Sequence, residues 1–306
     1  MGLPVYNGER FLGRAIDTLL AQTYRDFELI IVDNASSDGT EDICRAYAQR
    51  DRRIHYWRNG RNLGAMGNFR RVFELARGEL FKWAAHDDEH EPAFLEKCVT
   101  ALDGDPGLVL AYTQTRDIDA DGATLGIRST GLDTNSEDVA HRFRALVRRD
   151  YPCVLAFGVS RANMLRRTRL LQDYADCDRV LLAEIGLAGR IIELPDPLFV
   201  RREHKSRSVW QFRSRQTRSA WFDPSHAGKP SFPYTRQLLG YMSALGRAPI
   251  STVDRMRCGG VMAEWLGHNG NGLVEDMVYA TRYALRPLKR RMLHEPRPAR
   301  PARPAH

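Results

Sequence analysis

Residues 8–33 read GERFLGRAIDTLLAQTYRDFELIIVD, and this stretch decides the fold. Its first part repeats apolar side chains at helical spacing, and its last seven residues form an apolar run ending in Asp33. A short continuous run of this kind is typical of a parallel strand that is buried on both faces. The stretch therefore predicts a helix that leads into a buried strand. The helical stripe comprises Phe11, Leu12, Ala15, Ile16, Leu19 and Leu20.

The same alternation continues on both sides of this stretch. Residues 34–50 read as a polar loop that opens a helix, 53–57 as a strand, 66–78 as a helix closed by Gly78, and 79–85 as a strand. Alternating strands and helices predict an α/β fold with a doubly wound, mostly parallel sheet flanked by helices. Only three residues precede Pro4, so we expect either a start further upstream or a first strand that is nearly missing.

Composition places the chain among ordinary globular proteins. The 306 residues are 43% hydrophobic and 27% charged, and no apolar run approaches the roughly 18 residues of a membrane span. No signal peptide pattern opens the sequence, so we expect a cytoplasmic protein. The five cysteines are odd in number and form no CxxC pair, which argues against a disulfide framework and a structural zinc site. The net charge of +8 suits an anionic partner.

Two polar clusters follow predicted strands, where doubly wound sheets bind ligands. Residues 33–39 (DNASSDG) come after the second strand, and Asp33 can accept hydrogen bonds from a ligand there. A solvated turn with a helix cap is the alternative interpretation. Residues 86–88 (HDD) come after the fourth strand, and the adjacent carboxylates of Asp87 and Asp88 repel unless a cation compensates them. Oxygen ligands suit Mg²⁺ or Mn²⁺, and a run of acids at a helix start is the alternative.

Residues 2–40 and 59–89 carry a resemblance to a known family. A Pro-x-Tyr-Asn start, an Asp-Asn-x-Ser-x-Asp-Gly loop and an acidic strand end occur here in that order. The chain resembles the inverting family 2 glycosyltransferases of the GT-A fold, closely over about residues 2–115 and loosely over 155–205. The resemblance implies a nucleotide-sugar donor and a divalent metal.

The resemblance also implies roles for individual residues. Pro4, Tyr6 and Glu9 would line the nucleotide pocket, and Asp33 would bind the base. Asp87 would hold the metal with Asp88 beside it. The family has an acid two positions before the metal aspartate, and Ala85 stands there in this chain. The positions expected near the ribose and diphosphate are Asn62, Gly64 and Asn68.

The family's catalytic base is an acid that precedes a helix, and the matching region is residues 174–204. Asp178 aligns best, with Cys177 where the family often has glutamate, and Asp176 competes with it. A helix cap is the structural alternative for either acid. A base of this kind takes the proton of the acceptor hydroxyl, which direct displacement at the anomeric carbon requires.

Residues 201–208 (RREHKSRS) are basic and follow a predicted edge strand. They could fold over the diphosphate, which makes Arg202 a candidate donor-binding residue and His204 a candidate third metal ligand. A histidine beside arginine and lysine is also compatible with an ordinary surface position.

The sequence predicts three regions. Residues 1–210 would form the catalytic domain, 211–293 a mostly helical extension, and 294–306 a disordered Pro/Arg-rich tail. Within the extension, Leu273, Met277 and Tyr283 belong to an apolar stripe that precedes basic residues, which is typical of a helix resting on an anionic membrane; a helix docked on the core is the alternative. Aromatic and basic residues alternate in 210–234, but no nucleic-acid fold accompanies them, so no nucleic acid is expected.

These features predict an inverting, metal-dependent glycosyltransferase that moves a sugar from a nucleotide donor to a glycan or lipid-linked acceptor. Cell-surface polysaccharide or glycolipid synthesis is the expected setting, in the cytoplasm or peripherally at the inner face of the membrane. A catalytically silent nucleotide-sugar or nucleic-acid binding protein is the alternative. An NAD-dependent oxidoreductase is disfavoured because no GxGxxG follows the first strand.

Overall fold

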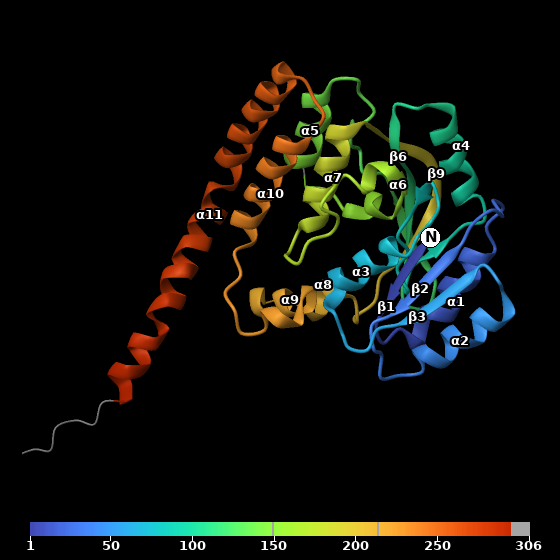
Figure 1. Ribbon diagram of the computed structural model, residues 1–306, viewed down its shortest axis with the longest axis horizontal. Coiled ribbons are helices and arrows are strands. Elements are labelled where there is room, and N and C mark those ends of the chain that lie inside the picture. Colours follow the sequence, from blue (N-terminus) through green and yellow to red (C-terminus); the bar gives the residue numbers. More distant parts are fainter. Residues whose placement is uncertain (149, 213, 295–306) are drawn as a thin grey trace, which may run out of the picture.

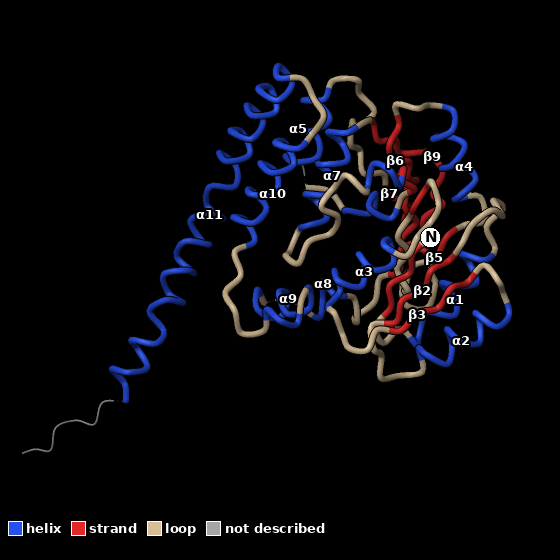
Figure 2. The backbone as a smooth tube through the Cα atoms, in the orientation of Figure 1, coloured by secondary structure: helices blue, strands red, loops and turns tan. Residues whose placement is uncertain are grey.

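The computed structural model describes residues 1–148, 150–212 and 214–294. It shows a twisted sheet flanked by helices, with a long C-terminal helix on the outside of the molecule (Figure 1, Figure 2). The α/β fold predicted from the sequence is confirmed.

The first three strands form a parallel sheet in the order β1–β2–β3, with β1 at Gly2–Val5, β2 at Leu29–Asp33 and β3 at Ile54–Arg58. Residues of β2 alternate between two buried clusters. Leu29 and Ile31 pack with α1 (Glu9–Leu20) and α2 (Thr40–Arg50), whereas Ile30 and Val32 pack with α3 (Gly64–Glu74). Both faces of β2 are therefore covered, which explains its uninterrupted apolar sequence.

A second, six-stranded sheet continues the first. Its path runs β4 (Leu80–Phe81), β8 (Val159–Arg161), β6 (Leu108–Ile118), β9 (Arg190–Arg202) and β5 (Glu89–His90), and β7 (Thr124–Arg128) pairs with β6. Within this sheet β6 and β9 are parallel and the other described pairs are antiparallel. Gly2 joins the two sheets, because its amide donates to the Lys82 carbonyl over 2.9 Å and its carbonyl accepts from the Ala84 amide over 2.8 Å.

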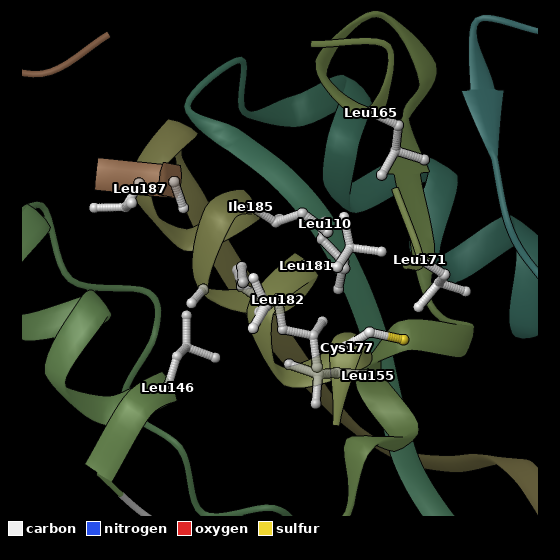
Figure 3. Packing of buried hydrophobic residues seen from close by; sticks show 14 of the residues in the cluster. Leu110, Leu146, Leu155, Leu165, Leu171, Cys177, Leu181, Leu182, Ile185 and Leu187 are labelled. Atoms are coloured by element: carbon white, nitrogen blue, oxygen red, sulfur yellow. The ribbon is translucent and has the colours of Figure 1, made fainter. Parts of the chain in front are cut away.

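Five helices follow β5, and all but the first contribute to the larger core. The first, α4 (Phe94–Gly104), packs in the smaller cluster with α1. The others are α5 (Val139–Arg148), the 3-10 helix η1 (Cys153–Phe157), α6 (Ala162–Leu165) and α7 (Cys177–Ala188). Figure 3 shows α7 side chains such as Leu181 and Ile185 meeting Leu110 of β6. Nearly every residue of α7 is buried, so this helix is the centre of the core rather than a surface element.

The remaining elements pack against the part of the chain that precedes them. They are α8 (Ser208–Gln211), α9 (Arg215–Phe222), η2 (Pro224–His226), α10 (Pro233–Arg247) and α11 (Thr252–His294). Buried residues of α10 and α11, among them Tyr241 and Trp265, join the same cluster as α5 and α7. The segment predicted as an extension therefore shares the core of the preceding region. Residues 295–306 of the predicted tail lie outside the described residues.

The apolar stripe predicted near the end of α11 is divided between two faces. Leu273 packs against the core, the Tyr283 hydroxyl donates to the Gly228 carbonyl over 3.0 Å, and Met277 is 69% exposed. One part of the stripe thus docks on the protein, as the alternative interpretation had it. None of the described helices combines the length and apolarity that a membrane crossing needs.

Candidate active site

The carboxyl ends of β1 and β2 carry two loops that are bonded to each other. The Asn7 amide donates to Ser36 Oγ and the Ser37 amide to Asn7 Oδ1, each over 2.9 Å. Asn7 has a φ of +50°, a left-handed conformation that asparagine tolerates better than most residues. The Gly8 amide donates to Thr40 Oγ1 over 2.9 Å. These bonds fix both loops at the edge of the sheet where a ligand was expected.

Asp33 is fully buried at the end of β2. One carboxylate oxygen accepts from the Ser36 amide over 2.8 Å, and the other accepts from the Tyr56 hydroxyl and from Arg58. The Arg58 guanidinium also lies 3.0 Å from Glu41. A ligand that bonds to Asp33 would therefore share this carboxylate with two side chains of β3.

The other residues assigned to the nucleotide pocket surround this loop. Pro4 is buried within β1, whereas Tyr6 is 46% exposed beyond the end of that strand. Glu9 begins α1 and accepts from the Gly39 amide over 3.1 Å. Tyr6 is the member of this group whose ring is open to a ligand.

A network of asparagines supports the loop before α3. Asn34 Nδ2 donates to Asn62 Oδ1 over 2.9 Å and to the Gly64 carbonyl over 3.1 Å. Asn68 is 3% exposed, and its amide donates to the Val32 carbonyl over 2.8 Å. Asn62 thus lies on the loop that faces the sheet edge and Gly64 begins α3, while Asn68 is buried beneath the loop and holds it in place.

Asp87 lies on the loop after β4 and faces His204 from the chain after β9. Its Oδ2 lies 2.9 Å from His204 Nε2, across 117 positions of sequence. Burial acts to raise the pKa of Asp87, but the hydrogen bond to His204 and the nearby His86 and Arg207 outweigh it and lower this pKa. Asp87 is therefore held as a carboxylate beside an imidazole nitrogen.

Asp88 faces inward. Its Oδ1 accepts from the Arg202 amide over 3.0 Å, and its side chain is almost fully buried. Burial and the neighbouring charge of Asp87 raise the pKa of Asp88. The two adjacent acids thus differ: Asp87 is stabilised as an anion, and Asp88 is anchored to the backbone of β9.

Arg202 was predicted to bind the donor, and the structure places its guanidinium elsewhere. It pairs with Glu89 and donates to the carbonyls of Asp119 and Ala120 over 3.1 and 3.0 Å. Together with Phe11 it lines a cleft of about 760 Å³. Its two terminal nitrogens are thus engaged by Glu89 and by the turn between β6 and β7.

Arg207 is a basic residue near the acidic loop that the sequence did not single out. Burial acts to lower its pKa, but pairing with Glu203 and the charges of Asp88 and Asp87 raise it overall. The stretch 201–208 predicted a basic flap, but only the fold shows which of its arginines lies in the field of the two acids.

The two candidate bases lie at the start of α7. Asp176 has a φ of +64°, and burial together with Asp178 raises its pKa. Asp178 lies in the first turn, and its Oδ1 accepts from the Arg179 amide over 2.9 Å. A non-glycine residue in a left-handed conformation costs energy and is found most often at functional sites. The left-handed backbone distinguishes Asp176 from Asp178.

Three segments that are distant in sequence meet at the first turn of α3. Cys177 Sγ lies 3.5 Å from Met66 Sδ, which brings the start of α7 against this turn. Gly64 has a φ of +79°, and a Cβ there would lie 2.3 Å from the Phe222 carbonyl oxygen at the end of α9. A side chain at Gly64 would therefore separate α9 from the loop. The Asp33 loop, the candidate bases and α9 share one locality.

The residues around Asp87 offer few ligands for a divalent ion. Among the described residues no group of three or more His, Cys, Asp or Glu side chains has the spacing of a metal site. Asp87 and His204 nevertheless form a close pair of an anionic oxygen and an imidazole nitrogen. Mg²⁺ is commonly held by one or two carboxylates plus phosphate oxygens and water, so Asp87 would fit such an ion, with the His204 imidazole beside it.

A model of the family described as glycosyl transferase family 2 matches residues 2–174, more than half of the chain. The chain belongs to glycosyl transferase family 2. The match contains the Asp33 loop, the asparagine network and the Asp87 loop.

Curated relatives of this family 2 member match over shorter stretches. An uncharacterized glycosyltransferase of Rickettsia typhi is 35% identical over 100 residues, which is 33% of this chain and 30% of that protein. The chondroitin synthase of Escherichia coli is 26% identical over 170 residues, 53% of this chain and 24% of the synthase. The matched part thus spans less than a third of either relative.

Solved structures share the fold of this family 2 member. The S. aureus TarS 1-349 structure in complex with UDP-GlcNAc has a TM-score of 0.65 at 15% identity and covers 88% of this chain and 71% of that one. The mannosyltransferase PcManGT from Pyrobaculum calidifontis, in complex with GDP-Man and Mn²⁺, has a TM-score of 0.51 at 19% identity. The match covers 95% of this chain and 82% of that one.

Proposed function

We propose that this chain is an inverting, metal-dependent glycosyltransferase that transfers a sugar from a nucleoside-diphosphate donor to a glycan or lipid-linked acceptor. The observation that carries the proposal is the convergence of three carboxylates on loops that contact one another. Asp33 ends β2, His86 beside Asp87 approaches Gly8 just after β1, and Cys177 beside Asp176 contacts Met66 in the first turn of α3. UDP-GlcNAc and GDP-Man, the donors named for the two solved structures above, belong to this chemical class.

Each group has a defined task in this proposal. Asp33 accepts hydrogen bonds from the base, and Asp87 with His204 would hold Mg²⁺ or Mn²⁺. Such an ion supplies charge stabilisation for the departing nucleoside diphosphate. Arg207 adds a positive charge on the same side. Asp176 takes the proton of the acceptor hydroxyl. The acceptor oxygen then bonds to the anomeric carbon while the bond between that carbon and the phosphate oxygen breaks.

Asp176 is preferred here over Asp178, the residue favoured by alignment. A base works best when its pKa lies near the working pH, and burial moves the pKa of Asp176 in that direction. The neighbouring Arg218, on α9, has a buried Nε without a hydrogen-bond partner in the described part of the chain. This guanidinium can stabilise Asp176 while acceptor and donor are bound.

Donor binding and turnover test the proposal directly. Calorimetry with UDP-, GDP- and dTDP-sugars, with and without Mn²⁺, should show Mn²⁺-dependent binding of one class of base. An assay for released nucleoside diphosphate should then show Mn²⁺-stimulated turnover. Binding without turnover would support a silent binding protein, which Ala85 in place of the family's acid favours. No binding of any donor would contradict both functions.

The acceptor side carries two further proposals. Synthesis of a cell-surface polysaccharide or glycolipid is supported by the match to chondroitin synthase, a protein named for a polysaccharide. Peripheral contact with an anionic membrane would come from Arg286, Lys289, Arg290 and Arg291 in the last turns of α11. Salt-sensitive co-sedimentation with anionic vesicles, lost on truncation before Arg286, is the expected result.

A further inference from the structure

The outer face of α11 is an extended surface without a partner in the described part of the chain. The inner face of this helix packs against α5 and α10 through Cys258, Val261, Met262 and Trp265. On its other side the helix borders solvent, and its C-terminal end extends beyond the rest of the described chain (Figure 1). A helix 43 residues long thus uses one face for folding and leaves the other free.

This outer face has a regular composition. Residues spaced alternately by three and four positions lie on it, and together they are called the outer stripe. They are exposed except Gly270, which is half-buried. Each residue of an α-helix is rotated by about 100° around the helix axis from the one before it. On this basis the stripe is centred about 180° from Trp265, opposite the buried face. The outer stripe consists of Val253, Met256, Gly260, Ala263, Gly267, Gly270, Val274, Met277 and Thr281.

The sizes of these residues are symmetric about Trp265. Small residues occupy the centre, valine and methionine flank them on both sides, and Thr281 follows at the C-terminal end. If a second, antiparallel copy of the helix is laid on the first with Trp265 at the midpoint, small residues face small ones and large residues face large ones. The facing pairs are Val253 with Met277, Met256 with Val274, Gly260 with Gly270, and Ala263 with Gly267.

We propose that two copies of this chain form a two-fold symmetric dimer by antiparallel packing of their outer stripes. Spacing of three and four residues is the pattern of helices that cross at about 20° and interlock side chains. Glycine and alanine at the centre let the two backbones approach closely, and the larger residues fill the space toward the ends. The bodies of the two protomers lie on opposite sides of the helix pair, since each is attached to the inner face.

Charge agrees with this arrangement. The outer stripe contains no charged residue over its length. The charged residues beside its centre are already paired within the chain, Arg257 with Asp138 and Glu264 with Arg144 and Arg148. Closing two such faces on each other therefore buries no charge that lacks a partner, which would otherwise oppose association.

The available area also suffices. From Val253 to Thr281 the stripe is about 42 Å long, and an α-helix is about 12 Å wide with its side chains. Two such strips amount to about 1,000 Å², the size from which specific interfaces begin. Leu266 and Val278 are exposed beside the stripe and enlarge the apolar area.

A second protein copy fits this face better than a lipid surface. A helix that rests in a membrane inserts large apolar side chains. The centre of the outer stripe is Gly260, Ala263, Gly267 and Gly270, which offer little apolar volume to lipid but allow a close helix contact.

Sedimentation velocity of the full chain over a range of concentrations tests the dimer. The chain should sediment with twice its mass of 34.9 kDa, and Gly267→Arg should return it to a monomer. A Cβ at Gly267 meets no atom within 4 Å, so the folded protomer has room for the new side chain. Gly104→Arg is the matched control, because Gly104 is equally open at the end of α4 and should leave the dimer intact.

A second measurement reports the register. Gly260→Cys and Gly270→Cys proteins should cross-link when mixed and oxidised, and neither should cross-link alone; a parallel pair would give the reverse. Met277→Glu, at the end of the stripe, should also weaken the dimer at least tenfold. A monomeric wild-type chain, a dimer that survives both Gly267→Arg and Met277→Glu, or a stripe needed only for vesicle binding would each overturn the proposal.

Discussion

Residues 82–91 build two polar clusters of opposite character within ten positions. Lys82 and His90 lie almost fully buried, with Lys82 Nζ 2.6 Å from His90 Nε2. Burial lowers the pKa of Lys82 to about 7, and it lowers the pKa of His90 well below its usual value. Asp87, between them in sequence, pairs instead with His204 and is stabilised as an anion.

The difference shows what separates a structural cluster from a candidate site. Lys82 and His90 face a core that contains Phe94 and Phe199, so their neutral forms are favoured. Asp87 faces His86, His204 and Arg207, which maintain its charge and could offer it to a cation. Histidine occurs in both clusters, and the groups that surround His90 and His204 give the two residues different roles.

Asp87→Asn should have the largest effect on turnover. Loss of the anionic ligand removes metal-assisted stabilisation of the leaving group, which contributes several kcal/mol, so Mn²⁺-stimulated turnover should fall about a thousandfold. Stability should change little. Asp103→Asn, an exposed acid on α4, is the matched control. Full Mn²⁺-stimulated activity in Asp87→Asn would remove this residue from the site.

Asp176→Asn should lower turnover about a hundredfold or more while leaving donor affinity unchanged, since a base acts on the acceptor proton. Steady-state kinetics combined with donor calorimetry separates the two effects. Asp178→Asn is the comparison variant. If Asp178→Asn alone causes the loss, the base is the acid favoured by alignment and the strain at Asp176 serves the helix start.

His204→Gln should weaken Mn²⁺ affinity by about ten- to a hundredfold, and a high Mn²⁺ concentration should restore the turnover of this variant. This effect is smaller than that of Asp87→Asn. Mn²⁺ titration of activity measures this. His55→Gln, on β3, is the control. An unchanged Mn²⁺ dependence would make His204 a partner that only orients Asp87.

Lys82→Met should have the smallest effect on turnover and a clear effect on stability. Because the folded pKa of about 7 lies below the unfolded value near 10.5, the folded chain binds fewer protons between these pH values, and its free energy of unfolding rises with pH there. Methionine removes this penalty, so the free energy of unfolding at pH 7 should rise by about 2 kcal/mol after the lost contact to His90 is subtracted.

Urea unfolding of Lys82→Met at pH 7 and pH 9 measures both the gain and the flatter pH dependence. Lys97→Met, an exposed lysine paired with Asp196, should change stability by less than about 0.5 kcal/mol. Destabilisation of Lys82→Met at both pH values would show that the Lys82–His90 contact supports the fold.

The elements that the sequence predicted best are those whose neighbours are close in the chain. The stripe from Leu12 to Leu19 became the buried face of α1, and the apolar run became β2 with Asp33 at its end. The third helix ends at Glu74 rather than near Gly78. The spacing of apolar residues does not show where the contacts of a helix with the rest of the protein end. Apolar residues that repeat every 3.6 or every 2 positions show which side of a helix or strand faces the core. This can be read without knowing which element packs against that side.

By itself, then, the sequence determined the α/β fold, the family and the loops that carry Asp33 and Asp87. Only the tertiary structure decided that His204 meets Asp87, that Arg202 turns to Glu89 while Arg207 lies in the field of the acids, and that the outer side of α11 has no partner in the described part of the chain. The physical reason is distance along the chain. Contacts between residues more than a hundred positions apart depend on how strands cross and which face each residue takes, and a single residue of shift along a strand reverses that face.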